Sequence, residues 1–161
     1  MTSSRPVEEA SEADRHREEQ PWDDASEVLL EEWCAKSVGV ASKHDREAKR
    51  AKALHALWGL PTVVIPVVIG PLNSLFSTDP LLKNVELVAL CLSGVCGAVT
   101  TFYNFGALAE RHFTFSAKYS DLITDIRHQL AKPRKYRSAC DVVTLRINML
   151  FDSINNNAPP I

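Results

Sequence analysis

The sequence is poor in the residue patterns that catalysis and metal binding require. Its four cysteines and five histidines share no zinc-finger spacing, and no histidine stands beside a nucleophile in a recognisable motif. Its six glycines form no phosphate-binding loop after a strand. We therefore expect no enzyme activity, no metal site and no cofactor, and we do not expect nucleic acid among its partners.

Two stretches in the middle of the chain also lack charge. Ala53–Leu72 has His55 as its only titratable group, and the segment between Glu86 and Glu110 has no formal charge. As helices these stretches would be about 30 and 35 Å long, and the hydrocarbon core of a bilayer is about 30 Å thick. The pattern predicts an all-α fold with a transmembrane helical hairpin, its spans at about 53–72 and 86–109.

Prolines in the first stretch are the main argument for a soluble alternative. Pro61, Pro66 and Pro71 would each cost roughly 3 kcal/mol in a soluble helix interior. Within a membrane, neighbouring helices and Ser or Thr side chains can bond to the carbonyls that proline frees. The flanking segments are too charged to bury two all-apolar helices, so we favour the membrane. Pro61 and Pro66 are the expected kink positions.

The acidic residues are concentrated at the start of the chain. Residues 1–32 contain eleven acidic and three basic residues. We expect residues 1–23 to be a disordered acidic tail, with Trp22 as a local anchor. This acidic tail has neither the apolar run nor the cleavage site of a signal peptide. Insertion into the membrane is therefore expected to depend on the first span.

The basic residues predict the orientation of the hairpin. Segment 33–52 has six, segment 111–137 has seven, and the loop expected at 73–84 has only Lys83. By the positive-inside rule, both termini should be cytosolic in a two-span protein of the lipid bilayer, although the kind of membrane is not specified. Because two cysteines would face the cytosol and two would lie in the second span, we expect no disulfide framework.

Three cytosolic helices are expected beside the spans, at about 24–52, 110–131 and 134–155. Asp24 to Glu27 resembles a capping box, and Lys132-Pro133 should end the second of these helices. Apolar residues recur at helical spacing in all three, so their stripes should pack as a helical bundle or coiled coil, which favours a homo-oligomer. The residues expected to pack there include Trp33, His44, His112, Tyr119 and Ile147, with Leu29, Leu108, Tyr136 and Leu150 on the same stripes.

One face of the second span combines small and polar residues. Ser93, Gly97, Thr100 and Asn104 recur at intervals of three or four. Small residues allow close helix packing in membranes, and hydroxyls or amides can hydrogen-bond across the contact. The same face could instead line a water path in an oligomer. The sequence leaves both interpretations open.

The order of these features resembles the SLATT family of small two-span membrane proteins. The resemblance covers about residues 28–161. Before the hairpin it rests on a helix with Trp33-Cys-Ala-Lys36 and on the His- and Ala-rich segment His44–Ala51 that leads into the first span. After the hairpin it rests on Ala109-Glu-Arg-His112, Tyr119-Ser-Asp-Leu122 and Pro159-Pro160. Each motif is weakly specific, and the resemblance depends on their order and spacing. The acidic tail has no counterpart in the family.

The resemblance implies a membrane effector proposed to form pores when a partner sensor triggers it. Unlike the multidomain members of the family, this sequence has no fused nucleotide-binding or sensing domain, so the trigger is left open, with a separate sensor or partner protein as one candidate. The alternative is a structural or scaffolding membrane protein that docks a cytosolic partner without transport.

Overall fold

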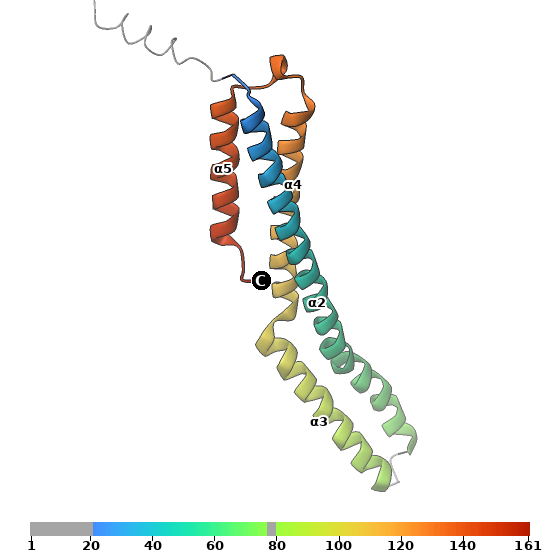
Figure 1. The fold of residues 1–161 in the computed structure, drawn as a ribbon. Coiled ribbons are helices and arrows are strands. Elements are labelled where there is room, and N and C mark those ends of the chain that lie inside the picture. Colours follow the sequence, from blue (N-terminus) through green and yellow to red (C-terminus); the bar gives the residue numbers. More distant parts are fainter. Residues whose placement is uncertain (1–20, 77–79) are drawn as a thin grey trace, which may run out of the picture. The chain divides into compact units, whose positions relative to one another are not determined.

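The structure, a computed structural model, describes residues 21–76 and 80–161. Every regular element in those ranges is helical (Figure 1), which confirms the predicted all-α class for that part of the chain. The elements are α2 (Asp24–Phe76), α3 (Pro80–Tyr103), α4 (Phe105–Ala131), the 3₁₀ helix η1 (Arg134–Tyr136) and α5 (Cys140–Asn157). Most of the predicted acidic tail lies outside the described residues.

The helices form two compact units. The bundle unit contains the described residues up to Gly39 together with Lys118–Asn157. The hairpin unit contains Val40–Ala117 and Ala158–Ile161. The long helices α2 and α4 contribute residues to both units.

The first turn of α2 is capped one residue earlier than predicted. Asp23 is the N-cap, because its Oδ1 accepts a hydrogen bond of 2.7 Å from the backbone N–H of Ser26. Bonds from the Ser26 hydroxyl and backbone lower the pKa of Asp23. The predicted capping box from Asp24 to Glu27 is therefore wrong, and the Glu27 carboxylate bonds instead to two arginines beyond α4.

The core of the bundle unit joins three helices. It consists of Leu30 from α2, two residues of α4 and two of α5, namely Leu122, Ile126, Val143 and Ile147. The stripe predicted on α4 is confirmed here, but on α2 Leu30 replaces the predicted Leu29, which is 37% exposed. One residue rotates a helix position by about 100°, so a shift of one changes the buried face.

The last helix starts later than predicted. α4 ends at Ala131, as Lys132-Pro133 indicates, but residues 134–136 form the short helix η1 and α5 begins only at Cys140. Tyr136, which was expected on the packed stripe, is therefore exposed. Leu150 is also partly exposed, and Phe151 packs against the core instead.

The connection between the two apolar helices is shorter than the predicted loop at 73–84. α2 continues to Phe76, and α3 begins at Pro80, a residue favoured in the first turn of a helix. Residues 77–79 lie outside the described ranges. Most of the expected loop is thus helical.

α3 and α4 are separated by the single non-helical residue Asn104, which falls inside the span predicted at 86–109. Asn104 has a positive φ of 45°, which asparagine tolerates better than most residues. Its N–H bonds to Thr100 O at 3.0 Å, as in an αL helix end, and its Oδ1 accepts from the N–H of Ala107 at 3.4 Å. Asn104 therefore ends one helix and caps the next.

Candidate functional site

The contact between α2 and α3 contains a hydrogen bond that compensates for a proline. Pro66 has no N–H, so the carbonyl of Thr62, four residues earlier, lacks its usual helical partner. The buried hydroxyl of Ser93 in α3 donates to this carbonyl at 3.4 Å. A polar residue predicted from sequence thus faces the partner helix of its own hairpin.

The next turn of α3 brings the two helices close together. A Cβ atom at Gly97 would lie 3.6 Å from Thr62 Cγ2, which is ordinary van der Waals contact. Cys96 beside it is 5% exposed. Small residues four apart at 93 and 97 therefore act as a close-packing motif within one chain.

The side chains of the other two residues of the predicted face make no hydrogen bond to α2 in the described part of the chain. The Thr100 hydroxyl bonds to carbonyls in its own helix, those of Cys96 at 3.2 Å and Gly97 at 2.8 Å. Asn104 is exposed at the break between α3 and α4. Beside it the rings of Tyr103 and Phe105 are stacked with centroids 5.4 Å apart.

A second face of α3 carries small residues that were not predicted as part of the polar face. Gly94, Ala98 and Thr101 are exposed, and a Cβ atom at Gly94 would meet nothing within 4 Å. The spacing that identifies Ser93 and Gly97 identifies these residues equally well. Only the position of α2 distinguishes the packed face from the open one.

The predicted kink residues lie within a helix that continues past them. Pro61 and Pro66 are both interior residues of α2. Near the first, the Thr62 hydroxyl donates to Gly59 O at 2.6 Å. This bond does not replace the N–H that Pro61 lacks, because the carbonyl four residues before Pro61 is that of Leu57.

Two predicted packing histidines meet inside the hairpin unit. Nδ1 of His44 and Nδ1 of His112 are 2.9 Å apart, and the residues are 0% and 4% exposed. The ring of Phe115 lies 6.1 Å from that of His44. Burial, followed by the charge of His112, lowers the pKa of His44. One Nδ1 carries the hydrogen of this bond and the other accepts it, so two cationic rings would lose the bond and place like charges in contact.

Leu108, which was expected on the packed stripe of α4, lies in the hairpin unit and is 40% exposed. Three further predicted packing residues lie in the bundle unit. Tyr119 is fully buried, with its ring centroid 6.2 Å from that of Phe151, and burial raises its pKa. Ile147 is in the core, and Trp33 packs against the core while remaining partly exposed.

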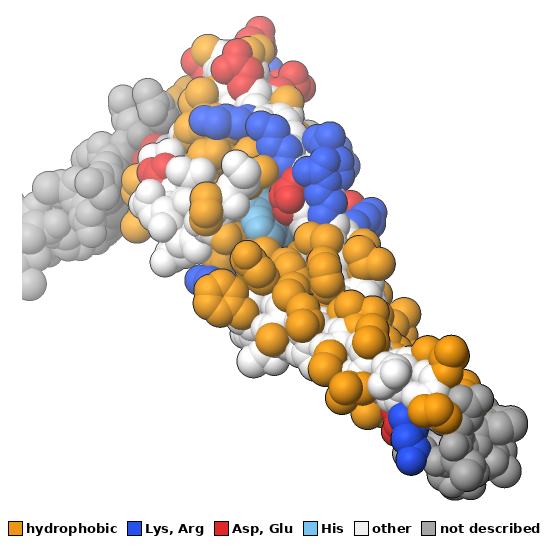
Figure 2. All heavy atoms as spheres, turned by 90° about the horizontal axis from the view of Figure 1, so that it is seen from below, with side chains coloured by type: hydrophobic (Ala, Val, Ile, Leu, Met, Phe, Trp, Pro, Cys, Tyr) orange, Lys and Arg blue, Asp and Glu red, His pale blue; other side chains and the backbone are white. Residues whose placement is uncertain are grey.

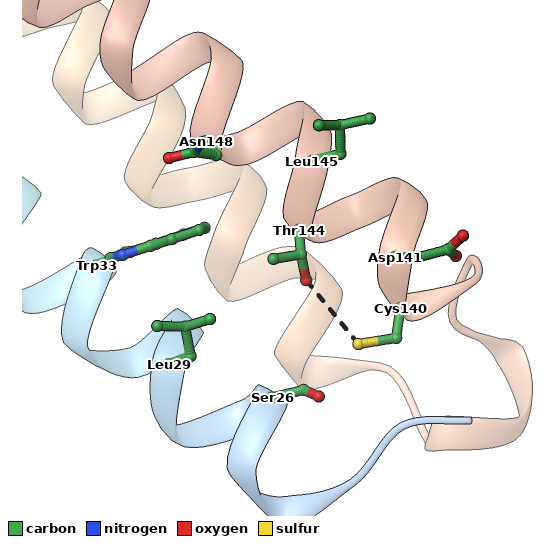
Figure 3. A pocket seen from close by; sticks show the side chains of 8 residues that line it. All are labelled: Ser26, Leu29, Trp33, Cys140, Asp141, Thr144, Leu145 and Asn148. Carbon is green, nitrogen blue, oxygen red and sulfur yellow. Dashed lines mark hydrogen bonds between the residues drawn. The ribbon is translucent and has the colours of Figure 1, made fainter. Parts of the chain in front are cut away.

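Trp33 also borders a groove between α2 and α5. Figure 3 shows Ser26, Leu29 and Trp33 from α2 opposite residues of α5, with Leu145 and Asp141 pointing away from α2. The groove has a volume of about 410 Å³ and also contains Thr144, which lies 3.9 Å from Cys140 Sγ. It is mainly apolar, with no cluster of ionisable groups.

A charged cluster joins the start of α2 to the segment between α4 and α5. Glu27 accepts bonds from Arg134 Nε, at 2.8 Å, and from Arg137, whose side chain is only 7% exposed. The two arginines hold the pKa of Glu27 at about 2. Arg137 also stacks over the ring of Trp22, whose Nε1 donates to Ser138 O at 2.8 Å, which confirms Trp22 as a local anchor.

Within residues 21–76 and 80–161, no group of three or more His, Cys, Asp or Glu residues is placed to hold a metal ion. All four cysteines are free thiols. The polar groups described above bond to the backbone, to each other or in ion pairs that join helices.

Comparisons with protein-family models, curated proteins and solved structures find no match to this chain. The fold and its contacts therefore define only a class, an all-helical protein with two helices long and apolar enough to cross a membrane.

Proposed function

We propose that this chain is an integral membrane protein that crosses the bilayer twice, through the apolar part of α2 and through α3. The observation that carries this proposal is the exposure of both apolar segments. None of the most apolar window of α2 and 11% of that of the following helix is buried within the chain. Figure 2 shows hydrophobic side chains covering this part of the molecule. Core helices of a soluble protein would be buried, whereas lipid-facing helices are not.

The proposed orientation places both termini in the cytosol. The side chains of α2 change from basic to apolar at Lys52 and Ala53, while Lys83 is the only basic residue near the opposite end of the hairpin. Loops rich in Lys and Arg stay on the cytosolic side. The aromatic residues around Asn104 have the character of an interfacial belt.

We further propose that copies of the chain associate through the bundle unit. α5 has a second apolar stripe, which is exposed and lies outside the core. It consists of Val142, Leu145 and Met149. These side chains are 57%, 61% and 64% exposed. Their spacing of three and four residues is that of a coiled-coil seam, which a second helix can cover.

The function that we propose for this assembly is a channel or a membrane-disrupting pore, as the resemblance to the SLATT family implies. Because Ser93 and Gly97 contact α2, the wall of the path would come from the open face of α3. That face contains Gly94, Ala98 and Thr101 and ends near Asn104. The trigger would be a separate sensor protein.

Release of ions or a small dye from liposomes that contain the purified protein tests the pore. The variant G94L/A98L/T101L replaces the small and polar face by leucine and should abolish release. The matched control V88L/V95L changes two other exposed residues of α3 and should release dye at the wild-type rate. The absence of release from every oligomeric form of the wild-type protein would reject a pore.

A scaffolding function without transport is the second candidate. It is favoured by the packing of Ser93 and Gly97 within the hairpin, since this removes half of the predicted polar face from a path. A scaffold would dock its partner through the bundle unit. Unchanged biological activity and assembly of the leucine variant, together with no dye release, would support the scaffold.

A further inference from the structure

Three basic side chains on one face of α2 line a pocket beside the apolar part of the same helix. Lys43, Arg46 and Arg50 are separated by three and four residues, so they share a face. With Glu47 and Ile161 they line a pocket of about 200 Å³ within the hairpin unit. Sequence alone explains these residues as an orientation signal on a solvated surface. The structure adds that all three side chains line the same pocket.

The charged side chains that line this pocket are unbalanced, three basic against one acidic. The side-chain carboxylate of Glu47 pairs with Arg50 at 2.8 Å. Lys43 and Arg46 make no ion pair with a carboxylate in the described ranges, and both are exposed. Arg46 uses its Nε in a bond of 3.4 Å to Ser42 O, which leaves the outer N–H groups of its guanidinium available. The pocket therefore suits an anion with several oxygen acceptors.

The position of the pocket along α2 indicates where such an anion would lie. At about 1.5 Å per residue, Arg50 is about 4.5 Å before Ala53, Arg46 is about 10 Å before it and Lys43 about 15 Å. The headgroup layer of each leaflet is roughly 5–8 Å thick. Arg50 would lie at headgroup depth, and Arg46 could reach the layer with its long side chain. Lys43 would attract the anion electrostatically without contacting it, since the Debye length is about 8 Å in physiological salt.

The surroundings of the pocket favour a lipid as the source of the anion. Lys and Arg side chains gather beside the hydrophobic surface of the molecule (Figure 2), and the exposed apolar residues of α2 begin with Leu54 in the same unit. A bound phospholipid could place its phosphate in the pocket and its acyl chains along these residues. A free anion would use only the first of these contacts.

We infer that this basic pocket binds the phosphate of an anionic phospholipid in the leaflet next to α2. The inference rests on the proposed insertion of the hairpin into a bilayer. Arg46 and Arg50 are the principal ligands for the phosphate, and Lys43 strengthens the binding at longer range. The occupied pocket would fix the depth of α2 in the membrane.

The full chain in a neutral detergent provides the test, with thermal unfolding measured during titration with phosphatidylglycerol, phosphatidylcholine or inorganic phosphate. Phosphatidylglycerol should raise the Tm of the wild type, and the other two should have little effect. The variant K43Q/R46Q/R50Q should lose apparent affinity for phosphatidylglycerol by tenfold or more. The matched control R127Q/K132Q/K135Q removes the same charge elsewhere and should keep the wild-type affinity.

Single variants distinguish binding in the pocket from general electrostatic attraction between the protein and anionic lipid. They remain useful if the triple variant does not fold. R50Q should weaken binding more than K43Q, because it lies nearer the headgroups. Equal losses in K43Q and R50Q, or equal losses in the triple variant and its control, would overturn the inference. An equal effect of inorganic phosphate would overturn it in favour of a free anion.

A separate measurement keeps this inference distinct from the proposed membrane insertion. Sedimentation without detergent shows whether the wild-type protein needs an amphiphile to stay dispersed. A protein that is monodisperse in water would contradict the membrane proposal. A protein that needs detergent but shows no preference for phosphatidylglycerol would contradict only the lipid pocket.

Discussion

The hydroxyl of Ser93 donates to the carbonyl of Thr62, the acceptor that Pro66 leaves without a helical N–H. This bond links the proline in one apolar helix to a polar residue in the other. Each feature would be unfavourable in lipid by itself, because an unsatisfied polar group in hydrocarbon is costly. Together they satisfy each other.

The first prediction is that Ser93 and Pro66 are energetically coupled. S93A should destabilise the hairpin by about 0.5–1 kcal/mol, a usual value for interhelical hydrogen bonds in membranes. In the P66A background the carbonyl regains its N–H partner, so the same substitution should cost less. Unfolding in mixed micelles measures the double-mutant cycle. An equal cost in both backgrounds would show that the bond does not compensate for the proline.

The second prediction concerns the close approach at Gly97. G97A should be tolerated, because the new Cβ would lie 3.6 Å from Thr62 Cγ2. G97L should separate the helices and lower the stability of the hairpin by about 1–3 kcal/mol, as overpacking does in other tight contacts. The control is G94L, on the open face of α3, where a side chain meets nothing within 4 Å. Unfolding in micelles compares the three variants, and similar losses for G97L and G94L would contradict the packing.

The third prediction is acid sensitivity that depends on Glu27. Its pKa falls from 4.5 to about 2 because it bonds to Arg134 and Arg137. The unfolded chain therefore takes up this proton first as the pH decreases, so the stabilisation present above about pH 4.5 is lost towards pH 2. E27Q should reduce this part of the pH dependence.

Thermal melts followed by circular dichroism between pH 6 and 2 measure the effect of E27Q. The matched control is E31Q, since Glu31 is exposed on the same helix and makes no ion pair within the described residues. Parallel pH profiles of E27Q and the wild type would argue against the charged cluster.

The fourth prediction concerns the histidine pair of the hairpin unit. The pKa of His44 is lowered by burial and by His112, so the unfolded chain binds a proton more readily than the folded one. Stability should be complete above the ordinary histidine value of 6.5 and should decrease as the pH falls below it. H44Q should weaken this dependence by removing the titrating group.

Thermal unfolding in detergent between pH 8 and 5 tests the histidine prediction. H128Q is the control, because His128 is exposed and should leave the profile of the wild type unchanged. Loss of the same pH dependence in both variants would show that the buried pair is not its source.

The sequence by itself determined the helical class and the approximate extent of its apolar segments. Charge-free runs and helical periodicity are local properties, so α3, the packed stripe of α4 and the end of α4 before Pro133 could be predicted. Positions that depend on one residue of register were predicted less well. Leu30 replaces Leu29, and Asp23 replaces Asp24 at the helix cap, because periodicity specifies a face only to within a residue.

Only the tertiary structure decided which residues meet. Ser93 and Gly94 are both small residues of the same helix, but the path of α2 buries the first and leaves the second exposed. The same holds for His44 and His112, which lie 68 positions apart and touch through Nδ1. Contacts between distant segments depend on how helices are placed in space, and a one-dimensional pattern of apolar and polar residues does not contain that placement.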